Sequence, residues 1–215
     1  KDENGNYAVT RQYFNKCYIT GNVDFIYGAG TSVFEDCDIV ARYTEYKSDG
    51  CYTAGRTYAS TPYGYVFNNC RFLAEEGVAD GAYRMARPWG ADDSTTFMNC
   101  YLGRAISLET SYGDMSGNLA ENARFAEYGS YGPGYTVNNK RPYLTSAQAA
   151  KFKTDTVMGD YDYSARTATL YGTQQEKPKT DITVVDKAEV VKNVAVDENA
   201  VIKNAAGETV SPGEV

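Results

Sequence analysis

The amino-acid sequence predicts an all-β protein, a right-handed parallel β-helix with projecting loops, a short C-terminal helix and a small strand-forming tail. The main observation is a pattern that occurs four times, with Phe three residues before Cys, a polar residue just before Cys and an apolar residue two after it. Its cysteines, at positions 17, 37, 70 and 100, are 20, 33 and 30 residues apart. Repetition at such steps without helical periodicity is typical of stacked coils of strands.

Each copy of the pattern is interpreted as part of one coil. Equivalent side chains of successive coils stack inside a β-helix, so the repeated Cys would form an interior ladder of small thiols. Phe and Cys are three residues apart, so regular strand alternation would place them on opposite faces. For both to point inward the alternation must break between them, and the polar residue before Cys suits a bend there. A β-sandwich with coincidental cysteines is the alternative, but four copies in matching register favour the β-helix.

Longer steps between copies predict where the chain leaves the regular coil. Steps of 33 and 30 residues exceed one coil, so we expect projecting loops within residues 41–65 and 74–95. Residues 145 to about 159 predict a short helix capped at Thr145 or Ser146. We expect this helix to pack on the last coils and to cover their open end.

The composition changes after about residue 172, where a polar, linker-like run begins and aromatic residues disappear. The sequence therefore predicts a β-helix over residues 1–172. Residues 173–215 are interpreted as a linker with a small β appendage, or as the start of a further module. Short strands are expected within this tail at 182–185, 190–191 and 194–196.

Composition excludes several classes of function. The 215 residues contain no histidine, which removes Ser-His and Cys-His nucleophile pairs and histidine metal sites. The net charge of -7, without a dense Lys/Arg run, argues against nucleic-acid binding. Five cysteines without a CxxC pair make zinc improbable. No apolar run approaches ~18 residues, so no membrane span is expected.

The segment 21–28, Gly-Asn-Val-Asp-Phe-Ile-Tyr-Gly, places one carboxylate, Asp24, in an apolar strand. Burying a carboxylate among such residues is costly unless a partner holds it. Asp24 is therefore either a structural acid bonded to an arginine or a catalytic group. The segment alone leaves both interpretations open.

Together with a later Arg-Pro-Trp-Gly at 87–90, this segment resembles the pectin methylesterases, carbohydrate esterases that demethylate homogalacturonan. Residues 63–70 (Tyr-Gly-Tyr-Val-Phe-Asn-Asn-Cys), 124–128 and 132–134 also match that family in order, so the resemblance covers roughly residues 7–160. The resemblance implies a right-handed parallel β-helix, in agreement with the repeat. It also implies hydrolysis of methyl esters with release of methanol and pectate.

The resemblance assigns roles to five residues. Asp24 would be the nucleophile, in its ionised form, and Arg87 the arginine that holds it. Trp89 would pack on a sugar ring, and Tyr27 and Met115 would contact the substrate. No metal and no other cofactor is implied.

The sequence departs from the family pattern in the acid/base segment. The family has a Gln-Asp-Thr motif about one coil before the nucleophile, together with glutamines that stabilise the oxyanion. Here glutamine occurs at 12, 148, 174 and 175, never before Asp, and Asp2 has little weight as a substitute. We therefore expect the chain to begin downstream of that motif, to need an N-terminal part of the same protein, and to be weakly active or inactive alone.

Two alternative classes stay open at this point. One is a non-catalytic pectin-binding β-helix, and the other is a pectate lyase or polygalacturonase on the same fold. The expected partner is methyl-esterified galacturonan, with no nucleic acid and no membrane, and the expected location is secreted, periplasmic or at the cell surface.

Overall fold

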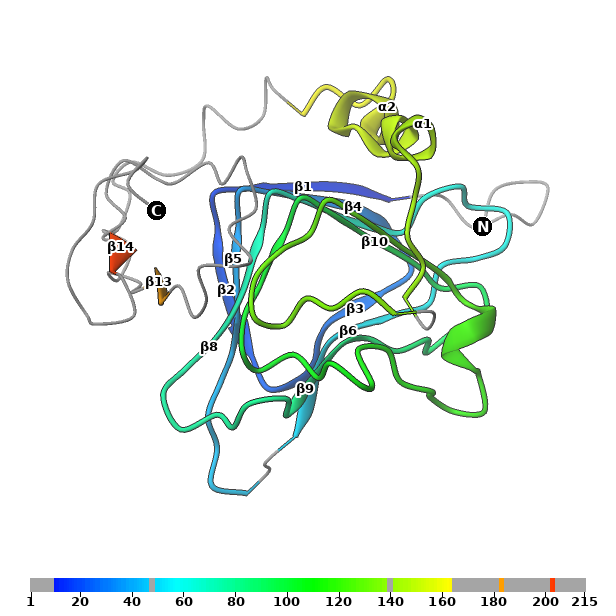
Figure 1. Ribbon diagram of the computed structural model, residues 1–215. Helices are drawn as coiled ribbons and strands as arrows, with labels where there is room; N and C mark the ends of the chain where they lie inside the picture. The colour runs from blue at the N-terminus through cyan, green and yellow to red at the C-terminus, as the bar shows by residue number, and fades with distance from the viewer. Residues whose placement is uncertain (1–9, 47–48, 139–140, 164–181, 184–201, 204–215) are drawn as a thin grey trace. The chain divides into compact units, whose positions relative to one another are not determined.

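The computed structural model describes residues 10–46, 49–138, 141–163, 182–183 and 202–203. The chain divides into two compact units, Lys1–Thr169 and Leu170–Val215. In the first unit the strands wind as a parallel β-helix, as the sequence predicted, and Figure 1 shows its successive coils overlapping around a common interior. The strands of this unit are β1 (Arg11–Asn15), β2 (Tyr18–Gly21), β3 (Val23–Gly28), β4 (Thr31–Glu35), β5 (Asp38–Ala41), β6 (Gly50–Gly55), β7 (Tyr65–Asn68), β8 (Arg71–Ala74), β9 (Tyr83–Ala86), β10 (Ser94–Met98), β11 (Tyr101–Leu102) and β12 (Arg124–Tyr128).

Three parallel sheets form the walls of the β-helix. Their strand orders are β1-β4-β7-β10-β12, β2-β5-β8-β11 and β3-β6-β9, so each coil adds one strand to each of the three sheets until the last coils. The helical segments of this unit are η1 (Ala120–Asn122), α1 (Ser146–Ala149), η2 (Ala150–Phe152) and α2 (Thr154–Met158). None of the helices within the described residues is long and apolar enough to span a membrane.

The Phe of the repeated pattern forms a stacked ladder inside the first sheet. Register aligns Phe14, Phe34, Phe67 and Phe97. Their neighbouring ring centroids are 4.7, 4.5 and 5.3 Å apart, with nearly parallel planes. Offset stacking of this kind adds to the burial of the aromatic area. The ladder therefore ties successive coils together along the axis.

The Cys of the pattern follows a bend, as the broken alternation predicted. The residue before each Cys has a positive φ of 52–53°. This left-handed conformation is one that Asn and Asp tolerate better than most residues, and it redirects the chain into the second sheet. Cys37, Cys70 and Cys100 are fully buried free thiols, and Cys17 is partly buried at the first coil. The four residues with positive φ are Lys16, Asp36, Asn69 and Asn99.

In the next strand of the sheet, β12, the position in register with the Phe ladder is occupied by a charged residue. Glu127 on β12 pairs with Phe97 and is completely buried. Arg141, also buried, donates from Nε and Nη2 to its two carboxylate oxygens at 2.7 and 2.5 Å, and the Tyr112 hydroxyl donates to it at 2.8 Å. Residues 141–144 continue the stack through a parallel bridge between Glu127 and Tyr143.

The expectation that the C-terminal helix covers the open end of the last coils is wrong. The helix begins as predicted, with a capping box in which Gln148 and Thr145 bond each other's backbone. However, α1 and α2 pack on the outer face of the first sheet, which Figure 1 shows beside β1 and β4. The reason is that alternation turns apolar side chains outward on this sheet, and the helices bury them. These side chains are Val33, Val66 and Met98, against Ala149, Val157 and Met158.

The second unit contains β13 (Ile182–Thr183) and β14 (Ile202–Lys203), which pair in parallel. β13 falls at the start of a predicted strand. The predicted strands at 190–191 and 194–196, the linker and the boundary after residue 172 lie outside the described residues, and they stay predictions.

Candidate active site

Asp24 lies on β3 where the strand departs from regular pairing. The register between β3 and β6 shifts between Val23 and Ile26, and Asp24 has a φ of 53°. Phe25 and Ile26 both pack into the core, so the irregularity leaves Asp24 and Tyr27 on the outer side of the sheet. Left-handed backbone costs an ordinary residue roughly 1 kcal/mol. Such strain concentrates at functional sites.

Arg87 holds the Asp24 carboxylate from the neighbouring part of the sheet. Arg87 follows β9, and its N–H donates to the Thr53 carbonyl of β6 at 3.1 Å. Its Nε and Nη2 donate to Oδ1 and Oδ2 of Asp24 at 2.7 and 2.5 Å, which is a bidentate pair. The side chains of Arg87 and Asp24 are 28% and 19% exposed, so the pair is reachable from solvent. The hydrogen bonds to Asp24 raise the pKa of Arg87 above its ordinary value.

Cys51 is a thiol close to this pair that the sequence did not single out. Cys51 pairs with Val23 on the next strand and is buried. Its Sγ donates to the Thr53 carbonyl at 3.2 Å. Burial, and secondly the charge of Asp24, raises the pKa of Cys51 to about 12. Because thiolate is the nucleophilic form of cysteine, Cys51 is not a nucleophile near neutral pH.

An aromatic pair borders the carboxylate. Tyr27, on β3, and Trp89, two residues after Arg87, meet edge to face with ring centroids 6.2 Å apart. They are 69% and 39% exposed, which is unusual for side chains of this size within one small area. Exposed aromatic faces beside a charged pair are suited to packing on sugar rings.

Met115 reaches this site only indirectly. Met115 and Asn118 exchange two backbone hydrogen bonds, of 3.0 and 2.8 Å. The Asn118 amide donates to the carbonyls of Pro88 and Trp89 at 3.2 and 3.1 Å. The structure therefore brings Asp24, Arg87, Tyr27 and Trp89 together directly, and it joins the loop of Met115 to them through Asn118.

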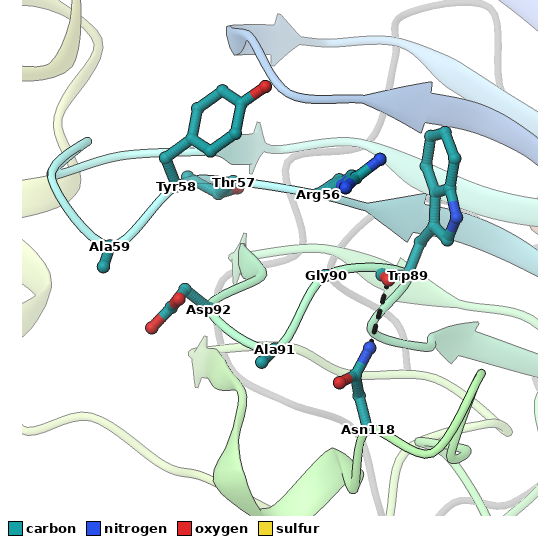
Figure 2. Close-up of a pocket in the computed structure, with 9 residues that line it drawn as sticks. All are labelled: Arg56, Thr57, Tyr58, Ala59, Trp89, Gly90, Ala91, Asp92 and Asn118. Carbon is teal, nitrogen blue, oxygen red and sulfur yellow. Dashed lines mark hydrogen bonds between the residues drawn. The ribbon is translucent and has the colours of Figure 1, made fainter. Parts of the chain in front are cut away.

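A pocket of about 330 Å³ opens beside Trp89. Residues 56–59, after β6, line one side of it, residues 89–92 line the other, and Asn118 completes it (Figure 2). Arg56, an exposed residue, lies here with its guanidinium carbon 5.3 Å from the centre of the Trp89 ring. A few residues further along the chain, Tyr63 packs on Phe152 and Tyr65 is buried beside Phe34.

Neither described glutamine lies on the sheet that carries Asp24, because Gln12 is on β1 and Gln148 is in α1. The carbonyl oxygen of the Gln12 side chain accepts from the Ser32 hydroxyl at 2.7 Å, and Gln148 closes the helix capping box. Asp2, Gln174 and Gln175 lie outside the described residues. Asn118, which holds the loop of Trp89, was missed because no local motif marks it, and Arg124 was noted only as part of the matching segment 124–128, without a role.

Comparison with known proteins identifies relatives over most of the β-helix. The family model described as Pectinesterase matches residues 5–161. Pectinesterase A of Dickeya dadantii (strain 3937) is 38% identical over 166 residues, covering 65% of this chain and 45% of that protein.

Solved structures give the same result. A pectin methylesterase in complex with a hexasaccharide has a TM-score of 0.62 at 34% identity, covering 70% of this chain and 52% of the other. The pectin methylesterase from carrot has a TM-score of 0.66 at 25% identity, covering 76% and 55%. The chain thus spans about half the length of the relatives it matches.

Proposed function

The chain belongs to the pectinesterase family, and from this premise we propose that it carries the nucleophile half of an esterase that removes methyl esters from homogalacturonan. The observation that carries the proposal is the bidentate Asp24–Arg87 pair, on an irregular strand between exposed aromatic side chains. An aspartate nucleophile must be ionised and aimed at the ester carbon. Two parallel charge-assisted hydrogen bonds from one guanidinium fix its direction.

In the proposed reaction an Asp24 oxygen bonds to the ester carbonyl carbon, and the bond from that carbon to the methoxyl oxygen breaks. The methoxyl group leaves as methanol once it receives a proton. Water then cleaves the resulting anhydride into the Asp24 carboxylate and a galacturonate carboxylate with release of two protons, one of which restores the proton donor. Arg87 holds Asp24 throughout, and Tyr27, Trp89 and Met115 bind the polymer.

The proton donor and the oxyanion donors belong, in this proposal, to a segment of the same protein that precedes Lys1. Support comes from the chain's coverage of about half of its relatives and from the placement of Gln12 and Gln148 away from the sheet of Asp24. Missing oxyanion donors cost roughly 10²–10³ in rate, and a missing general acid roughly 10²–10⁴. We therefore expect the 215 residues alone to be weakly active or inactive.

The experiment measures methanol release from highly methylated pectin by the 215-residue chain and by a chain that also carries the natural upstream sequence. We expect release from the longer chain and little from the shorter one. Rapid release by the 215 residues alone would refute the proposed division of the site. No release by either chain would refute the esterase assignment.

A non-catalytic pectin-binding β-helix is the second candidate, favoured by the position of both described glutamines away from the sheet of Asp24. It predicts that both chains bind methylated pectin and that neither releases methanol. The family match favours the esterase over the lyase and polygalacturonase alternatives. Secretion or attachment at the cell surface, where pectin is found, is part of the same proposal.

A further inference from the structure

The turn formed by residues 87–93 carries the arginine and the tryptophan of the candidate site. It lies beside the turn that follows β6, and the N–H of Gly90 donates to the Gly55 carbonyl at 3.0 Å. Figure 2 shows the two turns next to each other at Gly90 and Arg56, where a Cβ on Gly90 would lie 2.7 Å from the Arg56 side chain. The contact of Trp89 with Arg56 therefore depends on how closely these two turns pack.

The carboxyl group of Asp93 lies against this junction from its buried side. Asp93 is completely buried, and a Cβ on Gly55 would lie 2.0 Å from its Oδ1, so the carboxyl packs directly on the Gly55 backbone. The hydroxyls of Thr95 and Thr57 donate to Oδ1 at 3.4 and 3.5 Å. Oδ2 has no hydrogen-bond partner within the residues that the structure describes. Among these residues, hydrogen bonds therefore hold only one of the two carboxyl oxygens.

The backbone of Asp93 links this carboxyl to the rest of the turn. The N–H of Asp93 donates to the Gly90 carbonyl at 3.1 Å, and its carbonyl accepts from the N–H of Arg124 at 2.7 Å. The Arg124 guanidinium also donates to the Tyr58 carbonyl at 3.1 Å, so it ties the turn after β6 to the same point. A movement of the Asp93 carboxyl is therefore transmitted through Gly90 to Trp89, which precedes it.

The neutral and the charged carboxyl have different requirements at this position. A buried carboxylate oxygen without a donor is far more costly than the same oxygen of a neutral carboxyl. Burial accordingly raises the pKa of Asp93 to about 7, although its hydrogen bonds act in the opposite direction. Folded chains on the two sides of neutral pH thus differ in the charge beneath this turn.

Few charged groups face Asp93. Tyr65, on β7, is the titratable group that senses its charge, and burial raises the pKa of Tyr65 as well. Arg56 and Asp92, on the two turns, are exposed, and Arg124 binds backbone carbonyls. Over the described ranges no cation forms an ion pair with Asp93. The charge of an ionised Asp93 is therefore not compensated by a neighbouring side chain.

We propose that Asp93 is a positioning residue of the candidate site, whose neutral carboxyl keeps the turn 87–93 packed on Gly55 and whose ionisation displaces this turn. A charged Oδ2 requires a donor, and a shift of the turn away from Gly55 admits water to it. Because the same turn carries Arg87 and Trp89, the shift also changes how Arg87 holds Asp24. The inference rests on the proposed function only in giving that site a pH dependence.

The test uses Trp89, the only tryptophan of the chain, as a fluorescent reporter of the turn. The chain contains no histidine, so few other groups titrate near pH 7. Emission wavelength and acrylamide quenching of the 215-residue chain are measured from about pH 5 to about pH 9, with circular dichroism to verify that the chain stays folded. We expect a shift to longer wavelength and stronger quenching as pH rises, with a midpoint near pH 7.

Three variants separate Asp93 from other groups. Asp93→Asn cannot ionise, so its Trp89 signal should be independent of pH. Thr95→Val removes a hydrogen bond that favours the charged form and should move the midpoint upward by roughly 0.5 pH unit. Asp92→Asn, which changes the exposed carboxylate beside it, is the control and should keep the transition of the natural chain.

A Trp89 signal of the natural chain that stays constant over this range would overturn the proposal. The same transition in Asp93→Asn, or a midpoint that Thr95→Val leaves unchanged or lowers, would overturn it as well. The proposed esterase is tested separately by methanol release from the longer chain. An Asp93-dependent transition without methanol release would refute the esterase and keep the role of Asp93 in the turn.

Discussion

Asp93 gives a prediction whose magnitude follows from its surroundings. It lies between the loop 89–92 and β10 and is completely buried. Its Oδ1 accepts from the hydroxyls of Thr95 and Thr57 at 3.4 and 3.5 Å, and its Oδ2 has no hydrogen-bond partner among the described residues. The carboxyl fills the space beside Gly55, where a Cβ would lie 2.0 Å from Oδ1. Burial raises the pKa of Asp93 from its ordinary 3.8 to about 7, against the lowering effect of its hydrogen bonds.

The sign of the pH dependence follows from this shift. Between about pH 4 and pH 7 the folded chain holds a proton that the unfolded chain has lost, so the free energy of unfolding falls as pH rises through this window. The loss is absent below the unfolded pKa and complete above about pH 7. A shift of about three pKa units corresponds to roughly 4 kcal/mol in full, of which roughly 1 kcal/mol is already lost at pH 4.5.

Asp93→Asn removes this ionisation and keeps the shape of the side chain. We expect the free energy of unfolding of the variant, relative to the natural chain, to increase by roughly 3 kcal/mol between pH 4.5 and pH 8. Any packing cost of the amide is the same at both pH values and cancels. Urea titrations followed by circular dichroism at the two pH values measure this difference.

The control is Asp92→Asn, which changes the exposed carboxylate one residue earlier in the same loop. The variant leaves the buried Asp93 carboxyl in place, so its unfolding should keep the pH dependence of the natural chain. Tyr65, whose own pKa burial raises, is the titratable neighbour that senses the Asp93 charge, and it stays neutral over this range. A relative stability of Asp93→Asn that is the same at both pH values would refute the argument.

Three further changes test other parts of the structure. Arg141→Met leaves Glu127 buried without its cation, so urea titrations should show a loss of about 3–5 kcal/mol in the free energy of unfolding. Tyr112→Phe removes one hydrogen bond to Glu127 but keeps the ion pair, so it should cost less. Phe67→Ala removes a ring stacked on both sides and should cost about 3–5 kcal/mol, and a loss below 1 kcal/mol would contradict the ladder. Arg87→Lys cannot form two parallel hydrogen bonds to Asp24, so methanol release by the longer chain should fall at least about tenfold while its unfolding midpoint stays the same.

The β-helix could be predicted because its signal is local and repeated. Each copy of the Phe and Cys pattern carries its own alternation and its own bend, so the stack follows from residues close together in sequence. The helix at 145 was predicted for the same reason, since Thr145 and Gln148 form a local cap. Its packing face was not, because Val33 and Val66 become one outer surface only after the coils stack.

The candidate site was likewise predicted in part from local motifs and in part not predicted at all. Asp24 and Arg87 were paired from two motifs, and their hydrogen bonds confirm that they meet, while their roles stay proposals. The pocket was not predicted, because Asn118 and Arg124 act through backbone carbonyls on loops 29 and 66 residues away in sequence. Asp93 carries no sequence signal at all, since its burial depends on how two loops close over it.

Substitution of Asp24 tests the central claim most directly. In the longer chain, Asp24→Asn keeps the size of the side chain and removes the charge that the nucleophile requires. We expect methanol release from methylated pectin to fall by at least about 10³-fold, while binding of an esterified hexasaccharide is retained. The control, Asp80→Asn, changes an exposed ion pair elsewhere and should leave both methanol release and binding unchanged. Methanol release by Asp24→Asn at a tenth or more of the natural rate would contradict the assignment of Asp24 as the nucleophile.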